Sequence, residues 1–141
     1  MTPIFYALLS AIFASFVAIL GKLGLKEIDS TLATTVRSII MAGFLLLVSL
    51  SLGKFAGFSF NSLNGKQWLL IAGSGIAGAL SWLFYFFALK TGNASVVSAI
   101  DRLSLIFVVI LAAIFLGEHL SWRVALGALS MVAGTLLIVL K

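Results

Sequence analysis

The chain has 141 residues, of which 62% are hydrophobic and 9% charged, whereas a water-soluble domain carries about 25% charged residues. At about 20 residues for each membrane-spanning helix, this length holds five or six spans and leaves no room for a soluble catalytic or nucleic-acid-binding domain. The chain has no cysteine and one histidine, so we expect neither a metal site nor a cofactor.

Five long intervals without charged residues predict five transmembrane helices. These intervals are residues 2–21, 38–53, 67–89, 103–117 and 124–140. The second and fourth are too short to cross a hydrocarbon core about 30 Å thick, so these two helices must draw neighbouring charged residues into the membrane. The predicted spans are 3–24, 30–52, 67–90, 94–116 and 121–140.

The predicted fold class is therefore an all-α, polytopic membrane protein with one domain, residues 1–141. The first span has about 20 apolar residues and no basic segment before it, which favours a retained helix over a cleaved signal peptide. Polar residues stand where the next helices would start and are candidate caps: Asp29 or Ser30, Asn93 or Ser95, and Ser121. The longer connection, 53–66, carries Phe55, Phe58 and Phe60, which is typical of a loop in the headgroup region.

The basic residues are almost balanced between the two sides of the membrane. An odd number of spans puts the termini on opposite sides. The N-terminal side would carry Lys54, Lys66 and Arg123, and the other side Lys22, Lys26, Lys90 and Lys141. Under the positive-inside rule, a chain balanced in this way can insert in either orientation.

Gly73, Gly75 and Gly78 have the spacing of a dinucleotide fingerprint, but no strand precedes them and no acidic residue follows about 20 positions later. Small residues inside an apolar run instead favour close helix packing. Asn93 also begins a glycosylation sequon, for which a capping role is favoured. Glu118 and His119 adjoin a short loop, where a solvated turn is favoured over a proton relay.

Charged residues within the predicted spans give the strongest chemical signal. Arg37 and Asp101 lie at nearly equal depth, about 10 and 12 Å into the second and fourth spans, and Lys22 approaches that layer from the first. Asp101 and the adjacent Arg102 point about 100° apart on a helix. We therefore expect Asp101 to pair with Arg37 or Lys22.

Two interpretations of this layer remain open. The basic side chains could extend to the headgroups while Asp101 serves packing alone, or the layer could border a polar cavity. Residues of the third span favour the cavity because they fall near the same depth and combine polar with aromatic groups. They are Ser81, Trp82, Tyr85 and Phe86. The predicted substrate-binding residues are Arg37, Asp101, Arg102, Trp82, Tyr85, Ser81 and Lys22.

The fifth span has no charge between Val124 and Leu140. Gly127, Ser130 and Gly134 recur on one helix face, and small residues at such spacing let helices approach closely. This helix is expected to serve packing or dimerisation.

Three stretches of the chain resemble an EamA-type domain of the drug/metabolite transporter superfamily. They are SAIFASFVAILGKLGL, TLATTVRSII and the segment from Ala88 to Leu140. The resemblance implies one five-helix half of a fold that commonly has two halves related by an inverted repeat, with a central cavity. Asp101 and Arg102 fall where relatives often have an Asp-Lys pair. Ala99 stands where a proline, which would imply a helix break, is common.

Relatives of this type transport amino acids, other metabolites or drugs. We therefore expect a transporter of small organic solutes, not an enzyme, in the cell membrane. Because five helices are half of an alternating-access pair, we expect an antiparallel homodimer. The alternative is a non-transporting accessory subunit of a larger membrane complex. The small four-helix multidrug exporters of the superfamily use an acidic residue in the first helix, and residues 3–21 contain none, so a proton-coupled antiporter of that kind is disfavoured.

Overall fold

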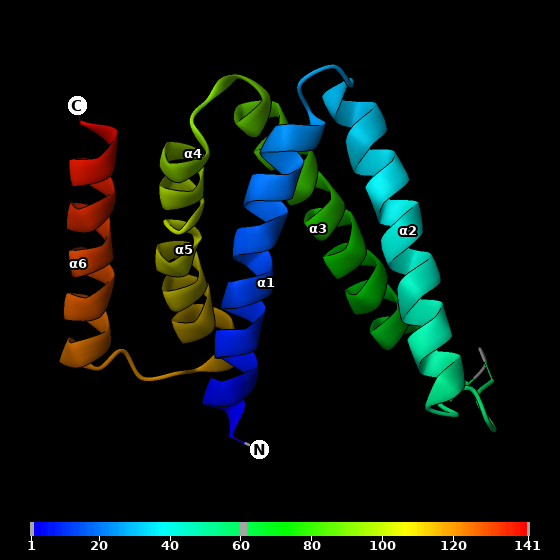
Figure 1. Ribbon diagram of the computed structural model, residues 1–141. Coiled ribbons are helices and arrows are strands. Elements are labelled where there is room, and N and C mark those ends of the chain that lie inside the picture. The colour runs from blue at the N-terminus through cyan, green and yellow to red at the C-terminus, as the bar shows by residue number, and fades with distance from the viewer. Residues whose placement is uncertain (1, 60–61, 141) are drawn as a thin grey trace. The chain divides into compact units, whose positions relative to one another are not determined.

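The computed structural model describes residues 2–59 and 62–140, so that Phe60 and Lys141 lie outside the described residues. Within these ranges the chain is helical and has no strand. Five helical segments are long and apolar enough to cross a membrane (Figure 1). They are α1 (Pro3–Gly24), α2 (Ser30–Ser51), α3 (Gly65–Thr91), a fourth segment (Ala94–Leu116) and α6 (Trp122–Val139). The predicted all-α fold with five spans is confirmed.

The chain divides into two compact units. The terminal unit combines Met1–Lys22 with Thr91–Lys141, and the central unit is Leu23–Lys90. Most of α1, the fourth segment and α6 belong to the terminal unit, whereas α2 and most of α3 form the central unit. The treatment of residues 1–141 as one domain stays a prediction.

Local hydrogen bonds explain where the helices begin. The Asp29 carboxylate accepts from the Thr31 and Leu32 N–H groups and caps α2, and the Ser121 hydroxyl caps α6 by accepting from the Val124 N–H. Asn93 occupies the cap position before the fourth segment but makes no side-chain cap bond.

The third span begins two residues before its predicted start at 67. Asn64 and Gln67 form a reciprocal pair, in which each backbone N–H donates to the other side chain at 2.9 and 2.8 Å. This pair is a capping box, and it satisfies two N–H groups that a helix start would otherwise leave open. The helix therefore begins at Gly65.

The fourth segment is not one regular helix. It consists of α4 (Ala94–Asp101), α5 (Ser104–Leu111) and the π-helix η2 (Ala112–Leu116). Between α4 and α5 the chain tightens, because the Leu103 N–H donates to the Ile100 carbonyl and the Leu105 N–H to the Arg102 carbonyl. Bonds between residues three apart are those of a 3₁₀ turn. The break therefore forms without a proline.

Gly117 ends this segment with a positive φ of 67°, a backbone conformation that glycine adopts without steric cost.

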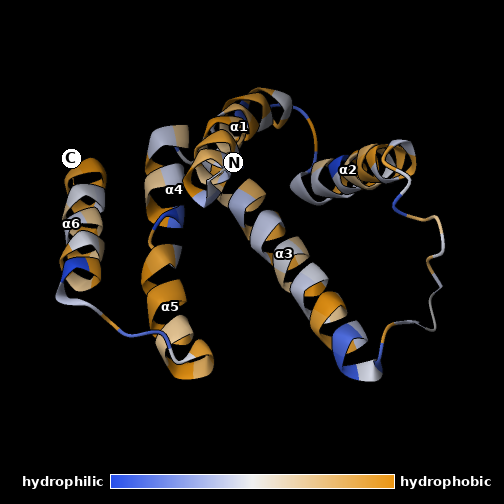
Figure 2. Cartoon of the chain, turned by 90° about the horizontal axis from the view of Figure 1, so that it is seen from below, coloured by the Kyte–Doolittle hydropathy of each residue, from blue (hydrophilic) through white to orange (hydrophobic). Residues whose placement is uncertain are grey.

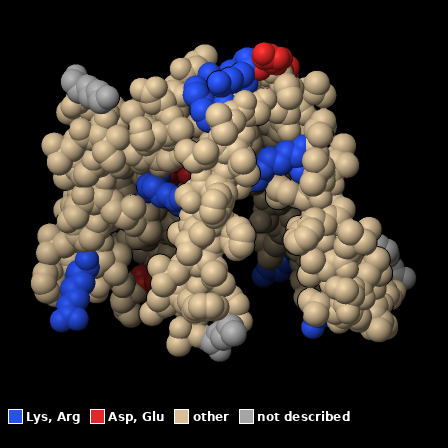
Figure 3. Space-filling model, viewed as in Figure 1, with Lys and Arg blue, Asp and Glu red and all other residues tan. Residues whose placement is uncertain are grey.

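Few side chains are buried within one copy of the chain. Among the described residues the buried apolar ones are Ala18, Leu25, Phe86 and Leu89. Figure 2 shows hydrophobic residues along every helix, and the face seen in Figure 3 carries few charged side chains. Apolar surface of this extent suits contact with lipid or with other membrane helices.

Candidate functional site

Arg37 lies against the aromatic rings of α3 in the central unit. Its guanidinium carbon is 3.9 Å from the centroid of the Trp82 ring and 5.5 Å from that of Phe86. Arg37 is the eighth residue of α2, about 10 Å along the helix from its first residue. The ring of Trp82 and the guanidinium are thus within cation–π distance inside two predicted spans.

The aromatic residues of this site form a contiguous cluster. Trp82 and Tyr85 meet edge to face at 5.6 Å, and Tyr85 and Phe86 do so at 6.1 Å. Phe86 is buried, whereas Trp82 and Tyr85 are half-buried. Trp82, Tyr85 and Phe86 thus form one aromatic wall on α3, and Arg37 lies against it. That this wall lines a cavity stays a prediction.

The face of α2 that holds Arg37 also carries two buried hydroxyls. Ser30, Thr34 and Arg37 follow at i, i+4 and i+7, so they share one side of the helix. The Thr34 hydroxyl donates to the Ser30 carbonyl at 2.7 Å. The Ser30 hydroxyl has no hydrogen-bond partner among the described residues.

Lys90 links the end of α3 to the connection before α2, because its ammonium donates to the Ile28 carbonyl at 3.1 Å. Asp29 lies beside this contact and outside the spans. The Leu32 N–H lowers the pKa of Asp29 below its ordinary value of 3.8, and the Thr31 N–H and the charge of Lys90 act in the same direction. Asp29 is thus an ionised cap and not a proton carrier at neutral pH.

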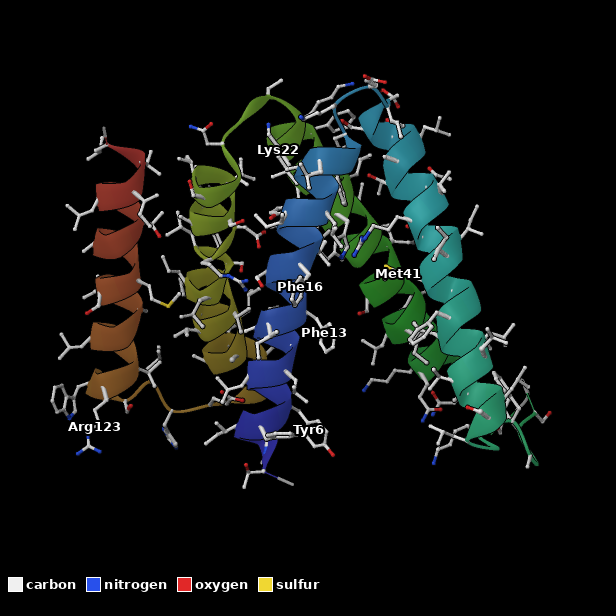
Figure 4. The ribbon with its side chains drawn as sticks, in the orientation of Figure 1. Tyr6, Phe13, Phe16, Lys22, Met41 and Arg123 are labelled. Atoms are coloured by element: carbon white, nitrogen blue, oxygen red, sulfur yellow. The ribbon has the colours of Figure 1, made fainter. Side chains whose placement is uncertain are left out.

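In the terminal unit, Lys22 holds the connection that precedes α4. Its ammonium donates to the Gly92 carbonyl at 2.8 Å. Figure 4 shows Lys22 near one end of α1 and Tyr6 near the other. A lysine in the last turn of a helix interacts favourably with the helix dipole. The hydrogen bond to Gly92 also ties the C-terminal end of α1 to the connection before α4.

Asp101 and Arg102 stand at the break in the fourth segment. Asp101 is the last residue of α4, Arg102 begins the turn, and both side chains are exposed in one copy of the chain. The pairing of Asp101 with Arg37 or Lys22 stays a prediction. Ser81 is also exposed, and its place in a cavity remains a prediction.

Thr135 of α6 donates a hydrogen bond at the break in the fourth segment. It is not among the residues predicted for the site. In a regular α-helix the Leu103 N–H would donate to the Ala99 carbonyl, but it bonds Ile100 instead. The Thr135 hydroxyl donates to the Ala99 carbonyl at 3.2 Å. Thr135 is 6% exposed, so a buried hydroxyl replaces the missing helical donor.

The small residues of α6 present an open surface. A Cβ atom added at Gly127 or Gly134 would meet nothing within 4 Å, and the Ser130 hydroxyl bonds the Leu126 carbonyl of its own helix. Within one copy of the chain these residues therefore do not hold two helices together. Their packing or dimerisation role stays a prediction.

Metal ligands do not gather in the described part of the chain, where no three His, Cys, Asp or Glu residues could hold one ion together. The arrangement described above is that of a polytopic helical membrane protein with a cation on an aromatic wall and a broken fourth span. Polar groups in such positions are typical of proteins that move solutes across membranes.

The chain matches the EamA-like transporter family over residues 1–140, and it belongs to that family. A protein of Sinorhizobium sp. named "Uncharacterized transporter in cobO 3'region" is 39% identical over 134 residues, which cover 95% of this chain and 94% of that protein. No solved structure matches the chain. The protein is thus a membrane transporter of the EamA family, as the resemblance implied.

Proposed function

We propose that the chain is a secondary transporter of small organic solutes that works in the cell membrane as an antiparallel homodimer, by alternating access. The observation that carries this proposal is the stack of Arg37 on Trp82, at 3.9 Å. Charged residues inside membrane spans are energetically costly and commonly line the pathway of a solute or an ion.

The cost of placing Arg37 inside a membrane span, compared with the gain from its aromatic contacts, supports a binding role for Arg37 over a packing role. An arginine at the centre of a spanning helix costs about 2.5 to 3.5 kcal/mol or more. A cation–π contact returns about 0.5 to 2 kcal/mol, depending on how far the charge is desolvated. The contact with Trp82 and Phe86 therefore offsets only part of this cost. Water or a polar solute beside Arg37 would offset the remainder.

The break in the fourth segment supports alternating access. Transporters commonly use discontinuous helices, in which irregular backbone lines a cavity. Here the break follows Asp101, an acidic residue inside a predicted span, and Thr135 supplies the hydrogen bond that the broken helix lacks. Asp101 and Arg102 are therefore proposed, with Ser81, Tyr85 and Lys22, to border the solute pathway.

Two features support the homodimer. The open surface at Gly127, Ser130 and Gly134 can receive a helix of a second copy, because small residues allow close approach. Basic residues also occur at both ends of the terminal unit, where Figure 4 shows Lys22 at one end and Arg123 at the other. Near-balanced charge lets two copies insert in opposite orientations.

Topology can be tested with cysteines introduced one at a time at Lys54 and Lys90, in a chain that has none of its own. An impermeant thiol reagent should label each position from both sides of the membrane. Labelling of each position from one side only would refute the antiparallel dimer.

Transport can be tested with purified protein in liposomes, using amino acids, organic acids, nucleosides and cationic dyes. Flux of at least one solute class above that of protein-free liposomes supports the proposal. Absence of flux, with copurification of a fixed membrane partner, would favour an accessory subunit instead.

A further inference from the structure

We propose that Arg37 binds the carboxylate of a small organic acid that carries a flat apolar group. This inference rests on the proposed transport function and names its substrate class. It concerns only the central unit, in which α2 supplies the cation and α3 the aromatic wall.

Arg37 has hydrogen-bonding capacity that the protein does not use. A guanidinium has five N–H donors in its plane, and Arg37 makes no hydrogen bond or ion pair with the described residues of the central unit. With its carbon 3.9 Å from the centroid, the guanidinium lies over the Trp82 ring. The indole has no conventional hydrogen-bond acceptor, so this contact leaves N–H donors of Arg37 available for a planar oxyanion.

A carboxylate matches these donors better than other polar groups do. Two parallel N–H donors of an arginine bind both oxygens of a carboxylate, and such charge-assisted pairs are among the strongest hydrogen bonds in proteins. In a site with little water the attraction between opposite charges is also stronger. A neutral amide or a hydroxyl would keep only part of this interaction.

The net charge of the central unit also favours an anion. Its acidic residues are Glu27 and Asp29, both of which precede α2. Asp29 is engaged as the cap of that helix. No carboxylate of the central unit thus lies within its spanning helices, and the aromatic face that could attract a cation is already covered by Arg37.

The apolar part of the solute is assigned to the aromatic cluster. Tyr85 is half-buried and meets Trp82 edge to face at 5.6 Å. Flat rings pack against such a cluster with offset or edge-to-face geometry. An acid whose carboxylate lies one or two bonds from a flat group would place both groups in this site.

The experiment uses three probes of similar size and different charge: phenylacetate, phenylacetamide and phenethylamine. The protein carries Trp68→Phe and Trp122→Phe, so that Trp82 is its only tryptophan, and is held in nanodiscs of zwitterionic lipid. Binding is followed by Trp82 emission and, independently, by thermal shift. Phenylacetate should bind saturably and at least tenfold more tightly than phenylacetamide or phenethylamine.

Variants then assign the preference to Arg37. Arg37→Gln should weaken phenylacetate binding at least tenfold, and Arg37→Lys should restore part of it, since lysine keeps the charge but not the fork of donors. Arg123→Gln is the matched control, because it removes an arginine charge beside another aromatic side chain and outside the central unit. In the natural chain the guanidinium carbon of Arg123 is 5.9 Å from the centroid of Trp122, and Trp122→Phe keeps an aromatic ring at that position. The phenylacetate affinity of Arg123→Gln should equal that of the parent.

Three results would overturn the inference: tighter binding of phenethylamine, no binding of phenylacetate, or equal binding by Arg37→Gln. The comparison of probes on the parent protein needs no variant, so misfolding of Arg37→Gln does not remove the test. Loss of phenylacetate binding in discs with phosphatidylglycerol that persists at high salt, where the surface charge of the lipid is screened, would show that the oxyanion at Arg37 is a lipid phosphate, which also overturns it.

Failure of this inference can be separated from failure of the proposed function. Phenylacetate binding with no flux of any solute refutes transport and keeps the anion site. Flux of a cationic solute without phenylacetate binding keeps transport and refutes the anion site.

Discussion

Replacement of Thr135 by valine tests how the broken fourth span is stabilised. Valine keeps the shape of threonine but removes the hydroxyl that donates to the Ala99 carbonyl at 3.2 Å. That carbonyl lacks its helical donor, because the Leu103 N–H bonds Ile100. The substitution should therefore leave a carbonyl without a hydrogen bond in a buried place.

The expected loss follows from two quantities. Hydrogen bonds between membrane helices contribute about 0.6 kcal/mol on average and up to about 1.7 kcal/mol, whereas a buried group left without a partner costs about 1 to 3 kcal/mol. At 3.2 Å the bond is longer than the usual range of about 2.5 to 3.0 Å for O–H···O bonds. We expect Thr135→Val to lower the free energy of unfolding by about 1 to 2 kcal/mol.

Thr34→Val is the matched control. Thr34 and Thr135 are both 6% exposed, but the Thr34 hydroxyl donates to the Ser30 carbonyl, which keeps its own helical donor. We expect a smaller loss, of about 0.5 kcal/mol, because this substitution removes one hydrogen bond but leaves no group unpaired. Denaturant titration in mixed micelles measures both, and equal losses for the two variants would refute the role assigned to Thr135.

Asp101 is exposed in one copy of the chain, so the ion-pair prediction applies to the assembled protein in detergent. There Asp101→Asn should lower the melting temperature by an amount that corresponds to about 3 kcal/mol for a broken buried ion pair, and Arg37→Gln or Lys22→Gln should recover it if that residue is the partner. Recovery by Arg37→Gln would show that Asp101 already occupies the donors of Arg37 and would contradict the anion site. Strict additivity with both would show that Asp101 pairs with neither. Gly134→Leu should weaken the homodimer in cross-linking or size-exclusion measurements while each copy stays folded, because the added side chain projects into the open surface of α6; an unchanged dimer would exclude this helix from the interface. Asp29→Ala should lower the melting temperature at pH 7, and its difference from the parent should shrink as the pH falls below 3.8 and then through the lowered pKa of Asp29. Stability from a carboxylate with a lowered pKa is present above its ordinary pKa and lost on protonation, so a difference that does not change with pH would contradict the role of the ionised cap.

Helix positions were predictable from the sequence because they depend on local composition. Charge-free intervals, extended where the membrane thickness required it, gave bounds within two residues of those observed. The start of α3 at Gly65 differs from the predicted start at 67 because Asn64 and Gln67 form a capping box, a signal that charge-free intervals do not contain.

The break after Asp101 could not be located in this way. A proline would have marked it, but Ala99 stands at that position, and α4 and α5 have ordinary apolar patterns. The carbonyl that the break leaves open accepts from a hydroxyl 36 residues later in the sequence. A single threonine in an apolar helix gives no sign of its partner, so the sequence does not identify Thr135 as part of the break.

Arg37 and Trp82 illustrate an intermediate case. Equal depth in two neighbouring spans predicted that both would border one layer, but depth does not fix which face of each helix is turned to the other. The direct stack of Arg37 on Trp82 comes from the structure. This contact places a cation against an aromatic ring, and it is the basis of the candidate site.

Solute flux in proteoliposomes tests the central claim most directly. The parent protein and Arg37→Gln are reconstituted at equal density, and uptake of carboxylates, neutral solutes and organic cations is compared with that of protein-free liposomes. The proposed function predicts uptake of at least one class by the parent protein, and the anion site predicts that this class is the carboxylates and that Arg37→Gln abolishes their uptake. Uptake by the parent protein that equals that of empty liposomes for every class would contradict the claim that this chain transports small organic solutes.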